Sequence, residues 1–215
     1  MLGFVGAHRT GKTTLANKYS QSYGVKVVEM NITEIQREIG YNSANQEYDI
    51  DSRLMVQEYV LERFCAIYDD IDDNQAVCDR TPLDLIGYTL CAVNDSLTAE
   101  QSDRLQRYIQ NCIEATNKYF TAILLIQPAI ALVEKAGSAK NCLGFIEKLN
   151  TIYLGVISDP RVLVTKRFLP RGVVKLDDRV RSARLTFETA INNSIHSRSI
   201  LNTICGVEIA TLIAS

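Results

Sequence analysis

A phosphate-binding loop lies near the start of the chain, where residues 6–13 read Gly-Ala-His-Arg-Thr-Gly-Lys-Thr and match the pattern G-x-x-x-x-G-K-S/T. Glycines let such a loop curl with its N–H groups inward, Lys12 would reach the β and γ phosphates, and the Thr13 hydroxyl would bind Mg²⁺. An apolar run at 2–5 and a helix-like stretch from about 13 to 19 flank the loop as the motif requires. The segment predicts binding of a nucleotide polyphosphate by Gly6, Ala7, His8, Arg9, Thr10, Gly11, Lys12, Thr13 and Thr14.

Charged residues follow two further apolar runs. Glu29 comes directly after the run 25–28, and Asp79 with Arg80 comes after the run 75–78. In an α/β sheet, ligands bind outside the carboxyl ends of the strands, so we expect these residues near the phosphate loop. Phosphoryl transfer needs a metal ion, cations on the migrating group and a carboxylate near the attacking oxygen, and these residue types supply the last two.

Each charged residue has a candidate role. Asp79 would hold Mg²⁺ opposite Thr13, directly or through water, and a charge pair with a nearby Lys or Arg is the alternative. Glu29 would accept the proton of an attacking hydroxyl or bind the acceptor, unless it is a solvated strand-end residue. Arg9 and Arg80 would clamp phosphates, since a guanidinium fork suits phosphate oxygens. The candidate catalytic residues are Lys12, Arg9, Asp79, Arg80 and Glu29, and the candidate metal ligands are Thr13 and Asp79.

The order of apolar patterns predicts the elements that position these residues. Five short, mostly unbroken apolar runs indicate buried parallel strands, at residues 2–5, 25–28, 75–78, 121–126 and 162–165. Helical spacing of apolar residues occurs between them, and Thr98 with Gln101 forms a plausible capping box for one helix. Strands that alternate with helices imply crossover connections. We therefore expect an α/β fold, with a five-stranded parallel sheet and helices on both faces.

Two motifs resemble those of known kinases. The loop 6–14 looks like the phosphate loop of thymidylate kinases that carry an Arg within it. Residues 79–88, Asp-Arg-Thr-Pro-Leu-Asp-Leu-Ile-Gly-Tyr, resemble their DRY-type motif with a following Ala-Tyr or Gly-Tyr pair, and also the Asp-Arg-Ser-Pro motif of small bacterial and phage P-loop kinases. The resemblance implies a three-layer P-loop kinase fold that uses ATP and Mg²⁺. According to this resemblance, Arg9 would be a catalytic arginine, and Lys12 and Thr13 would bind the donor phosphates and metal. Asp79 with Arg80 would be the metal-linked and acceptor-side pair.

The chain departs from thymidylate kinases at two places. Those enzymes have an Asp in the loop that holds the sugar 3′-hydroxyl of the substrate, and this chain has His8. They carry an Arg-Glu-Pro-Gly-like run after the second strand, whereas here Val28 precedes Glu29 and Met30 follows it. The leading acceptor is a free nucleoside or deoxynucleoside monophosphate. The alternative is 5-hydroxymethyluracil within DNA, the substrate of a thymidylate-kinase-like phage branch, and a P-loop NTPase without an acceptor is the third reading.

Basic residues gather between 161 and 184, although the net charge of the chain is −2. In this stretch Arg179, Arg181 and Arg184 are expected to lie largely off the apolar stripe of a helix. The stretch is either a solvated face or a surface that binds phosphates or DNA. The small net charge gives no general attraction to nucleic acid or to an anionic membrane.

Length and composition fit one domain that spans residues 1–215, with 47% hydrophobic and 22% charged residues. Six widely spaced cysteines without a CxxC pair indicate a reduced, cytoplasmic setting, which is the host cytoplasm if the chain is phage-encoded. No signal peptide is expected, and the apolar tail is too short and mixed to span a bilayer. Residues 135–141 are expected to form a lid-like loop, no role is assigned to 192–215, and the oligomeric state, a homodimer included, stays open.

Overall fold

A parallel sheet forms the centre of the protein, whose computed structural model describes residues 1–41, 49–71, 76–93, 96–130 and 142–213, with the backbone alone from residue 197. The strand order is β2-β3-β1-β4-β5, and every neighbouring pair is parallel. The strands are β1 (Leu2–Val5), β2 (Lys26–Val28), β3 (Ala76–Cys78), β4 (Ala122–Ile126) and β5 (Thr165–Leu169). The five-stranded parallel sheet expected from the sequence is confirmed.

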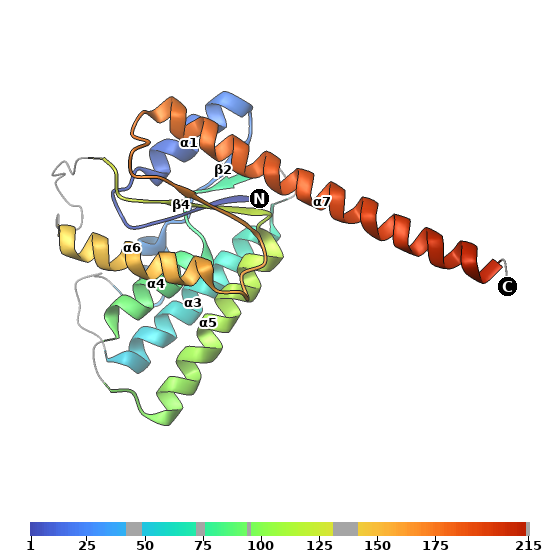
Figure 1. Cartoon of the computed structure of the whole chain (residues 1–215). Helices are drawn as coiled ribbons and strands as arrows, with labels where there is room; N and C mark the ends of the chain where they lie inside the picture. Colours follow the sequence, from blue (N-terminus) through green and yellow to red (C-terminus); the bar gives the residue numbers. More distant parts are fainter. Residues whose placement is uncertain (42–48, 72–75, 94–95, 131–141, 214–215) are drawn as a thin grey trace.

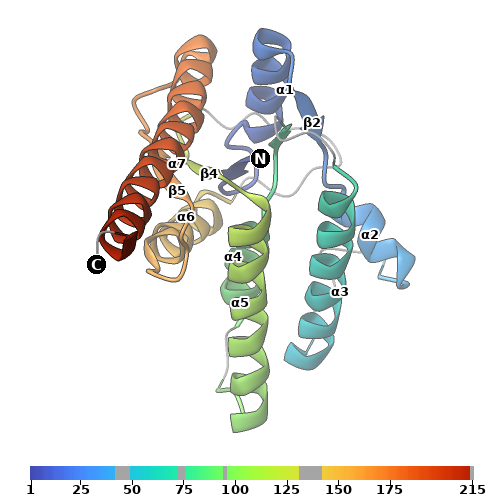
Figure 2. The same cartoon turned by 90° about the vertical axis from the view of Figure 1, so that its right-hand side faces the viewer.

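Helices cover both faces of this sheet, which confirms the three-layer α/β architecture (Figure 1). One face carries α1 (Lys12–Tyr23) and α7 (Leu176–Ile213), which pack against each other. Figure 2 shows the same layers from the side. The helices on the other face are α2 (Ile32–Glu38), α3 (Ile50–Asp69), α4 (Pro82–Ala92), α5 (Ala99–Tyr119) and α6 (Leu143–Ser158).

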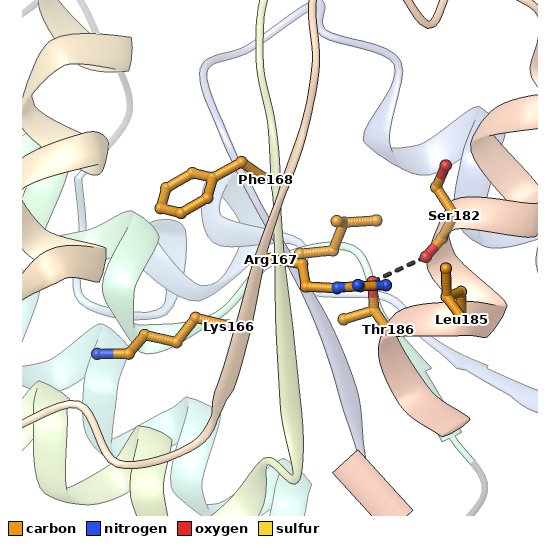
Figure 3. A pocket seen from close by; sticks show the side chains of 7 residues that line it. Lys166, Arg167, Phe168, Ser182, Leu185 and Thr186 are labelled. Carbon is orange, nitrogen blue, oxygen red and sulfur yellow. Dashed lines mark hydrogen bonds between the residues drawn. The ribbon is translucent and has the colours of Figure 1, made fainter. Parts of the chain in front are cut away.

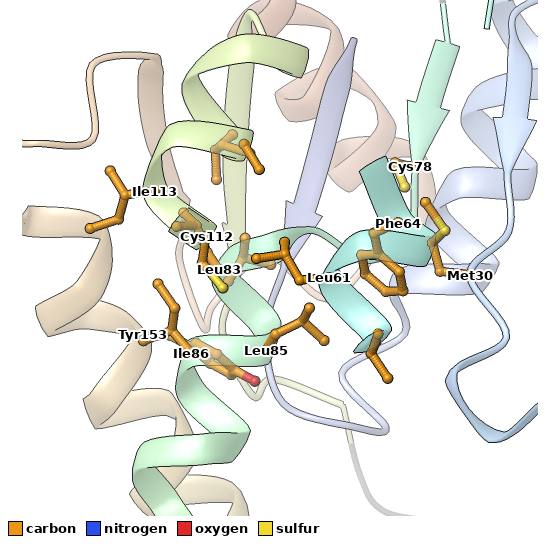
Figure 4. Packing of buried hydrophobic residues seen from close by; sticks show 14 of the residues in the cluster. Met30, Leu61, Phe64, Cys78, Leu83, Leu85, Ile86, Cys112, Ile113 and Tyr153 are labelled. Carbon is orange, nitrogen blue, oxygen red and sulfur yellow. The ribbon is translucent and has the colours of Figure 1, made fainter. Parts of the chain in front are cut away.

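Two apolar cores lie on opposite faces of the sheet because side chains alternate along each strand. Leu2 and Phe4 of β1 point into the smaller core, beneath α1 and α7. Val5 points into the larger core, where residues of α3, α4, α5 and α6 pack together (Figure 4). The central strands are therefore buried on both faces, as their unbroken apolar runs indicated.

The fifth strand is the one whose predicted position was wrong. The apolar run 162–165 was expected to form it, whereas β5 begins at Thr165 and ends at Leu169. Val162 and Val164 are buried, but they join the larger core from the loop before the strand. The strand itself lies at the sheet edge and exposes Arg167 and Phe168, and charged residues are common on edge strands because they discourage pairing with other chains.

The C-terminal tail continues as helix. Residues 192–213, which had no expected role, belong to α7, and the helix extends well beyond the body of the protein (Figure 1). The lid-like loop expected at 135–141 lies outside the described residues. None of the helices in the described ranges combines the length with the apolar character that crossing a membrane requires.

A glycine allows α4 and α6 to approach closely. A Cβ built on Gly87 of α4 would lie 2.0 Å from Cε1 of Tyr153 in α6, a separation that no real pair of carbons adopts. Tyr153 is fully buried, and its hydroxyl donates to the backbone oxygen of Asp84 at 3.3 Å. The ring therefore cannot swing into solvent to make room for a side chain at position 87.

We predict that Gly87→Ala lowers the free energy of unfolding. The clash with Tyr153 costs about 1–3 kcal/mol as overpacking, and the 2.0 Å approach to a buried ring places it near the upper end. Alanine gains only roughly 1 kcal/mol over glycine in a helix. Gly155→Ala in α6 is the matched control, since nothing lies within 4 Å of the new Cβ, and it should leave stability unchanged or raise it. Urea denaturation followed by circular dichroism measures both changes, and equal midpoints for the two variants would contradict the packing argument.

Candidate active site

The phosphate loop joins β1 to α1 and needs unusual backbone conformations. Gly6 has φ 153° and Gly11 has φ 83°, while Arg9 has φ 63°, a left-handed value in a residue that carries a side chain. A Cβ on Gly6 would lie 2.5 Å from the backbone oxygen of Ile126, so the loop also passes close to the end of β4. Left-handed non-glycine residues gather at functional sites, where surrounding contacts hold them.

Lys12 is buried inside this loop. Its Nζ donates to the backbone oxygens of Gly6 and Ala7, at 3.0 Å for Ala7, and lies 3.9 Å from Oδ1 of Asp84. Burial lowers the pKa of Lys12 to about 8, and the Asp84 carboxylate opposes that shift. The loop carbonyls therefore bind the Lys12 ammonium inside the curled loop, where a phosphate would be bound.

Thr13 and Asp79 meet across the site, as a shared metal would require. The hydroxyl of Thr13 donates to Oδ2 of Asp79 at 2.8 Å. Oδ1 of Asp79 is buried and accepts no hydrogen bond from the described residues. A buried carboxylate oxygen normally has a partner, and a hydroxyl beside a carboxylate suits Mg²⁺, which takes few protein ligands together with phosphates and water. The two predicted metal ligands therefore fit the ion.

The fully buried residue Asp84 connects the loop to α4, and no role was assigned to it from the sequence. Its Oδ1 accepts from the N–H of Gly6 at 3.3 Å, and its Oδ2 accepts from the N–H and the hydroxyl of Thr81 at 2.8 and 3.1 Å. Burial raises the pKa of Asp84, and the cations of Lys12 and Arg80 oppose that shift. The Thr-x-x-Asp spacing at 81–84 is a capping-box signal that could have identified it.

His8 and Arg80 belong to a second group of side chains beside the loop. Nδ1 of His8 lies 3.5 Å from the hydroxyl of Tyr88, and the His8 ring is 5.7 Å from the ring of Phe145. The guanidinium of Arg80 stands 5.9 Å from the centre of the Tyr88 ring. Nε2 of His8 and Nη1 of Arg80 are buried without a hydrogen-bond partner among the described residues. Two polar atoms are thus available to a ligand at this side of the loop.

Burial and nearby cations favour the neutral form of the His8 ring. Burial, and then the cations of Lys12, Arg9 and Arg80, lower the pKa of His8 below its ordinary value. Tyr88 and Phe145, the ring neighbours of His8, were not predicted as site residues. An aromatic residue at helical spacing gives no sign in the sequence of what its ring faces.

Glu29 and Thr14, two of the predicted site residues, are less closely connected to the other residues of the site. Glu29 follows β2 at the edge of the sheet, is exposed, and forms no hydrogen bond or ion pair within the described part of the chain. Thr14 is exposed on the first turn of α1, next to Thr13. Glu29 therefore has the environment of a solvated strand-end residue, one of the two readings that the sequence left open.

Arg179 lies elsewhere than the sequence indicated. We expected it off the apolar stripe of α7, but its side chain is only 1% exposed. It lies three residues after Leu176 and four before Ala183, so it shares their face, and its Nη2 donates to the backbone oxygen of Thr10 at 2.7 Å. Arg179 thus contacts the phosphate loop and is not available to a nucleic-acid backbone.

Four other residues of the basic stretch 161–184 form ion pairs within the protein. Their ion pairs join Arg161 to Asp159, Arg171 to Glu147, Arg181 to Asp178 and Arg184 to Glu188. Lys166, Arg167 and Lys175 have no ion-pair partner among the described residues, and Arg167 and Lys175 are exposed. The positive charge that this stretch offers to a polymer is therefore smaller than its sequence indicates.

A phosphate loop on a three-layer parallel α/β fold, with Thr13 and Asp79 facing each other, defines a P-loop nucleotide-binding protein. The chain belongs to the AAA domain family, whose model matches residues 2–136 and so includes the phosphate loop and the segment 79–88. A search of curated protein sequences finds no match for the chain.

Solved structures with the same fold include a deoxyadenosine kinase and a thymidylate kinase. Deoxyadenosine kinase from M. mycoides with bound dCTP has a TM-score of 0.60 and 15% identity, covering 91% of this chain and 98% of that chain. Thymidylate kinase from Candida albicans has a TM-score of 0.60 and 18% identity, covering 89% and 92%. YorR protein from Bacillus subtilis in complex with phosphorylated GDP has a TM-score of 0.53 and 13% identity, covering 87% and 95%. The TM-scores and coverages show a shared fold, that of the P-loop kinases, and at these low identities they show the fold alone.

We predict that Asp84→Ala destabilises the protein strongly. The change leaves the Lys12 ammonium and the Gly6 and Thr81 donors without their acceptor, and breaking a buried ion pair from one side costs about 3–5 kcal/mol. Asp69→Ala is the control, because Asp69 forms an exposed ion pair with Lys118 and its loss should change stability little. Chemical denaturation of both variants measures the difference, and a similar loss in each would show that Asp84 does not hold the site together.

Proposed function

We propose that the protein is an ATP-dependent phosphotransferase that moves the γ-phosphoryl group to a nucleotide-type acceptor, a free nucleoside or a deoxynucleoside monophosphate. The observation that carries the proposal is the 2.8 Å contact between Thr13 of the phosphate loop and Asp79, with Arg80 beside it. This pairing supports a metal-bridged polyphosphate on one side and an acceptor on the other. The kinase fold and the two similar nucleoside and nucleotide kinases support the same class of reaction.

The donor nucleotide would occupy the loop. Bound phosphates would take the Lys12 ammonium from the carbonyls of Gly6 and Ala7, and the N-terminus of α1 would face them. Mg²⁺, held by Thr13 and Asp79, would neutralise charge that develops on the transferred group. Arg9, in its left-handed conformation within the loop, is proposed as the catalytic cation.

The acceptor would bind beside Arg80. The buried Nη1 of Arg80 lacks a hydrogen-bond partner within the described ranges, and so does Nε2 of His8. These two nitrogen atoms are available for hydrogen bonds with polar groups of the phosphoryl acceptor. The rings of Tyr88 and Phe145 next to them supply apolar contact for a sugar or base. Glu29 is proposed as the acceptor-side base, a role that requires the acceptor hydroxyl to reach the end of β2.

A second candidate acceptor is 5-hydroxymethyluracil within DNA. It is favoured by His8, which lies beside Tyr88 and Phe145 at the loop position where thymidylate kinases read a free 3′-hydroxyl, and whose pKa is lowered by burial and nearby cations. Ion pairs within the stretch 161–184 weigh against extensive contact with the DNA backbone. A P-loop NTPase without an acceptor is the remaining alternative. The unpaired cysteines of the described chain support a cytoplasmic setting, that of the host if the protein is phage-encoded.

Transfer of radiolabelled γ-phosphate tests the function. Purified protein with Mg²⁺ and labelled ATP would be offered deoxynucleoside monophosphates, nucleosides, and DNA that contains 5-hydroxymethyluracil, with an acceptor-free reaction alongside. We expect label in a free nucleotide product. Label in DNA alone would transfer the assignment to the second candidate, and steady hydrolysis that no acceptor changes would reject a kinase.

We predict that Lys12→Ala and Asp79→Ala each lower kcat by about two to three orders of magnitude or more, because both groups act on charge in the transition state. Lys26→Ala is a matched control, since Lys26 lies exposed on β2 and should keep full activity. Initial rates with the accepted substrate measure all three variants. A loss below about tenfold for either site variant would remove that residue from the catalytic machinery.

A further inference from the structure

Arg179 joins the C-terminal helix to the phosphate loop across 169 residues of sequence. Its Nη2 donates to Thr10, and its Nη1 would lie 2.9 Å from a Cβ on Gly11, the residue directly before α1. The guanidinium therefore fills the space against the loop backbone at the point where α1 begins. Within the described residues, no other hydrogen bond joins α7 to the loop.

The charge of this buried group is not balanced by any carboxylate in the described part of the protein. Arg179 forms no ion pair with any carboxylate of the described chain, and its Nε is buried without a hydrogen-bond partner there. Burial alone lowers the pKa of Arg179, with no opposing contribution from an acidic neighbour. An unpaired buried charge is costly, and the positive N-terminus of α1 next to it adds to the repulsion.

An anion in the loop would remove that imbalance. A polyphosphate bound to the loop N–H groups would place negative charge on the far side of the same short segment, Thr10 and Gly11, that Arg179 touches. Opposite charges attract more strongly where the dielectric is low, and the Arg179 side chain is almost completely buried. The buried guanidinium is thus better tolerated with nucleotide bound than without it.

The contacts between α7 and the rest of the protein differ along the helix and between its sides. Its first turns pack through Val180 and Ala183 into the core beneath α1, and Arg184 stacks over the ring of Tyr23 at 4.9 Å. On the β5 side a partly open pocket of about 330 Å³ lies between α7 and the sheet, with Arg167, Ser182 and Thr186 among its lining residues (Figure 3). Further along, the helix leaves the body of the protein and Ile195 is exposed (Figure 1). The docked segment is thus tied to α1 and the loop but is incompletely packed towards β5.

We propose that Arg179 is a positioning residue that couples the docking of α7 to nucleotide in the phosphate loop. Nucleotide strengthens the attachment of the helix through the buried guanidinium. By thermodynamic reciprocity, anything that displaces α7 weakens nucleotide binding. The inference goes beyond the proposed phosphotransfer and rests on it only in requiring that the loop binds nucleotide.

Hydrogen exchange of α7, with and without saturating Mg·ADP, tests the coupling in the full-length protein. We expect ADP to slow exchange of the docked residues 180–190 several-fold in the wild type. In Arg179→Met this protection should disappear and the Kd for ADP should rise about tenfold or more. Arg181→Met, three-quarters exposed on the same helix and paired with Asp178, should behave as the wild type.

Two further variants separate the charge from the hydrogen bond. Arg179→Gln keeps a donor for the Thr10 carbonyl but removes the charge, so we expect the same loss of protection and affinity as in Arg179→Met. Arg179→Lys keeps the charge and should retain most of both. If circular dichroism shows that Arg179→Met does not fold, the Gln and Lys variants test the coupling in its place.

The outcomes are distinct. ADP-induced protection of α7 in Arg179→Gln equal to that of the wild type, or an unchanged Kd for ADP in that variant, would overturn the coupling while leaving the phosphotransferase intact. Failure of the wild-type protein to bind ADP in calorimetry would overturn this inference and the proposed function together.

Discussion

The buried carboxylate of Asp84 determines how the phosphate loop and the segment after β3 lie relative to each other. One of its oxygens accepts from Gly6 at the start of the loop, and the other accepts from Thr81 at the cap of α4. Because the group is fully buried, water cannot replace either partner, so both segments are held to one position. Asp79 lies between β3 and this anchor, and it accepts a hydrogen bond from Thr13 at the end of the loop.

The second feature on which the site depends is the positive charge that surrounds the phosphate loop. Lys12 is buried within the loop, Arg179 is buried behind it, and Arg80 is half-buried at its side. Asp84 opposes only part of this charge, and Oδ1 of Asp79 is still without a donor in the described chain. In an environment of low dielectric, such an arrangement favours a ligand with several negative charges and a divalent cation. The same electrostatics that would bind a polyphosphate also connect α7 to the site.

Local patterns predicted the architecture well and the site in part. Unbroken apolar runs identified the central strands because those strands are buried on both faces, and the capping box of Thr98 and Gln101 begins α5 as expected. The same reasoning misplaced β5, since an edge strand carries charged residues and the apolar Val162 and Val164 are buried from a loop. Periodicity also assigned Arg179 to solvent, because a charged residue on a helix is usually exposed.

The sequence by itself determined the phosphate loop, the order of strands and helices, and therefore the carboxyl-terminal sheet edge where charged residues gather. These features depend on backbone sterics at residues such as Gly6 and Gly11 and on short-range hydrophobic patterns, which a local stretch of sequence contains in full. Only the tertiary structure decided that Asp84 anchors the loop, that Tyr88 and Phe145 enclose His8, and that Arg179 reaches Thr10. Those contacts join residues distant in the chain, and each is specified by the packing of the whole core rather than by its own neighbours in sequence.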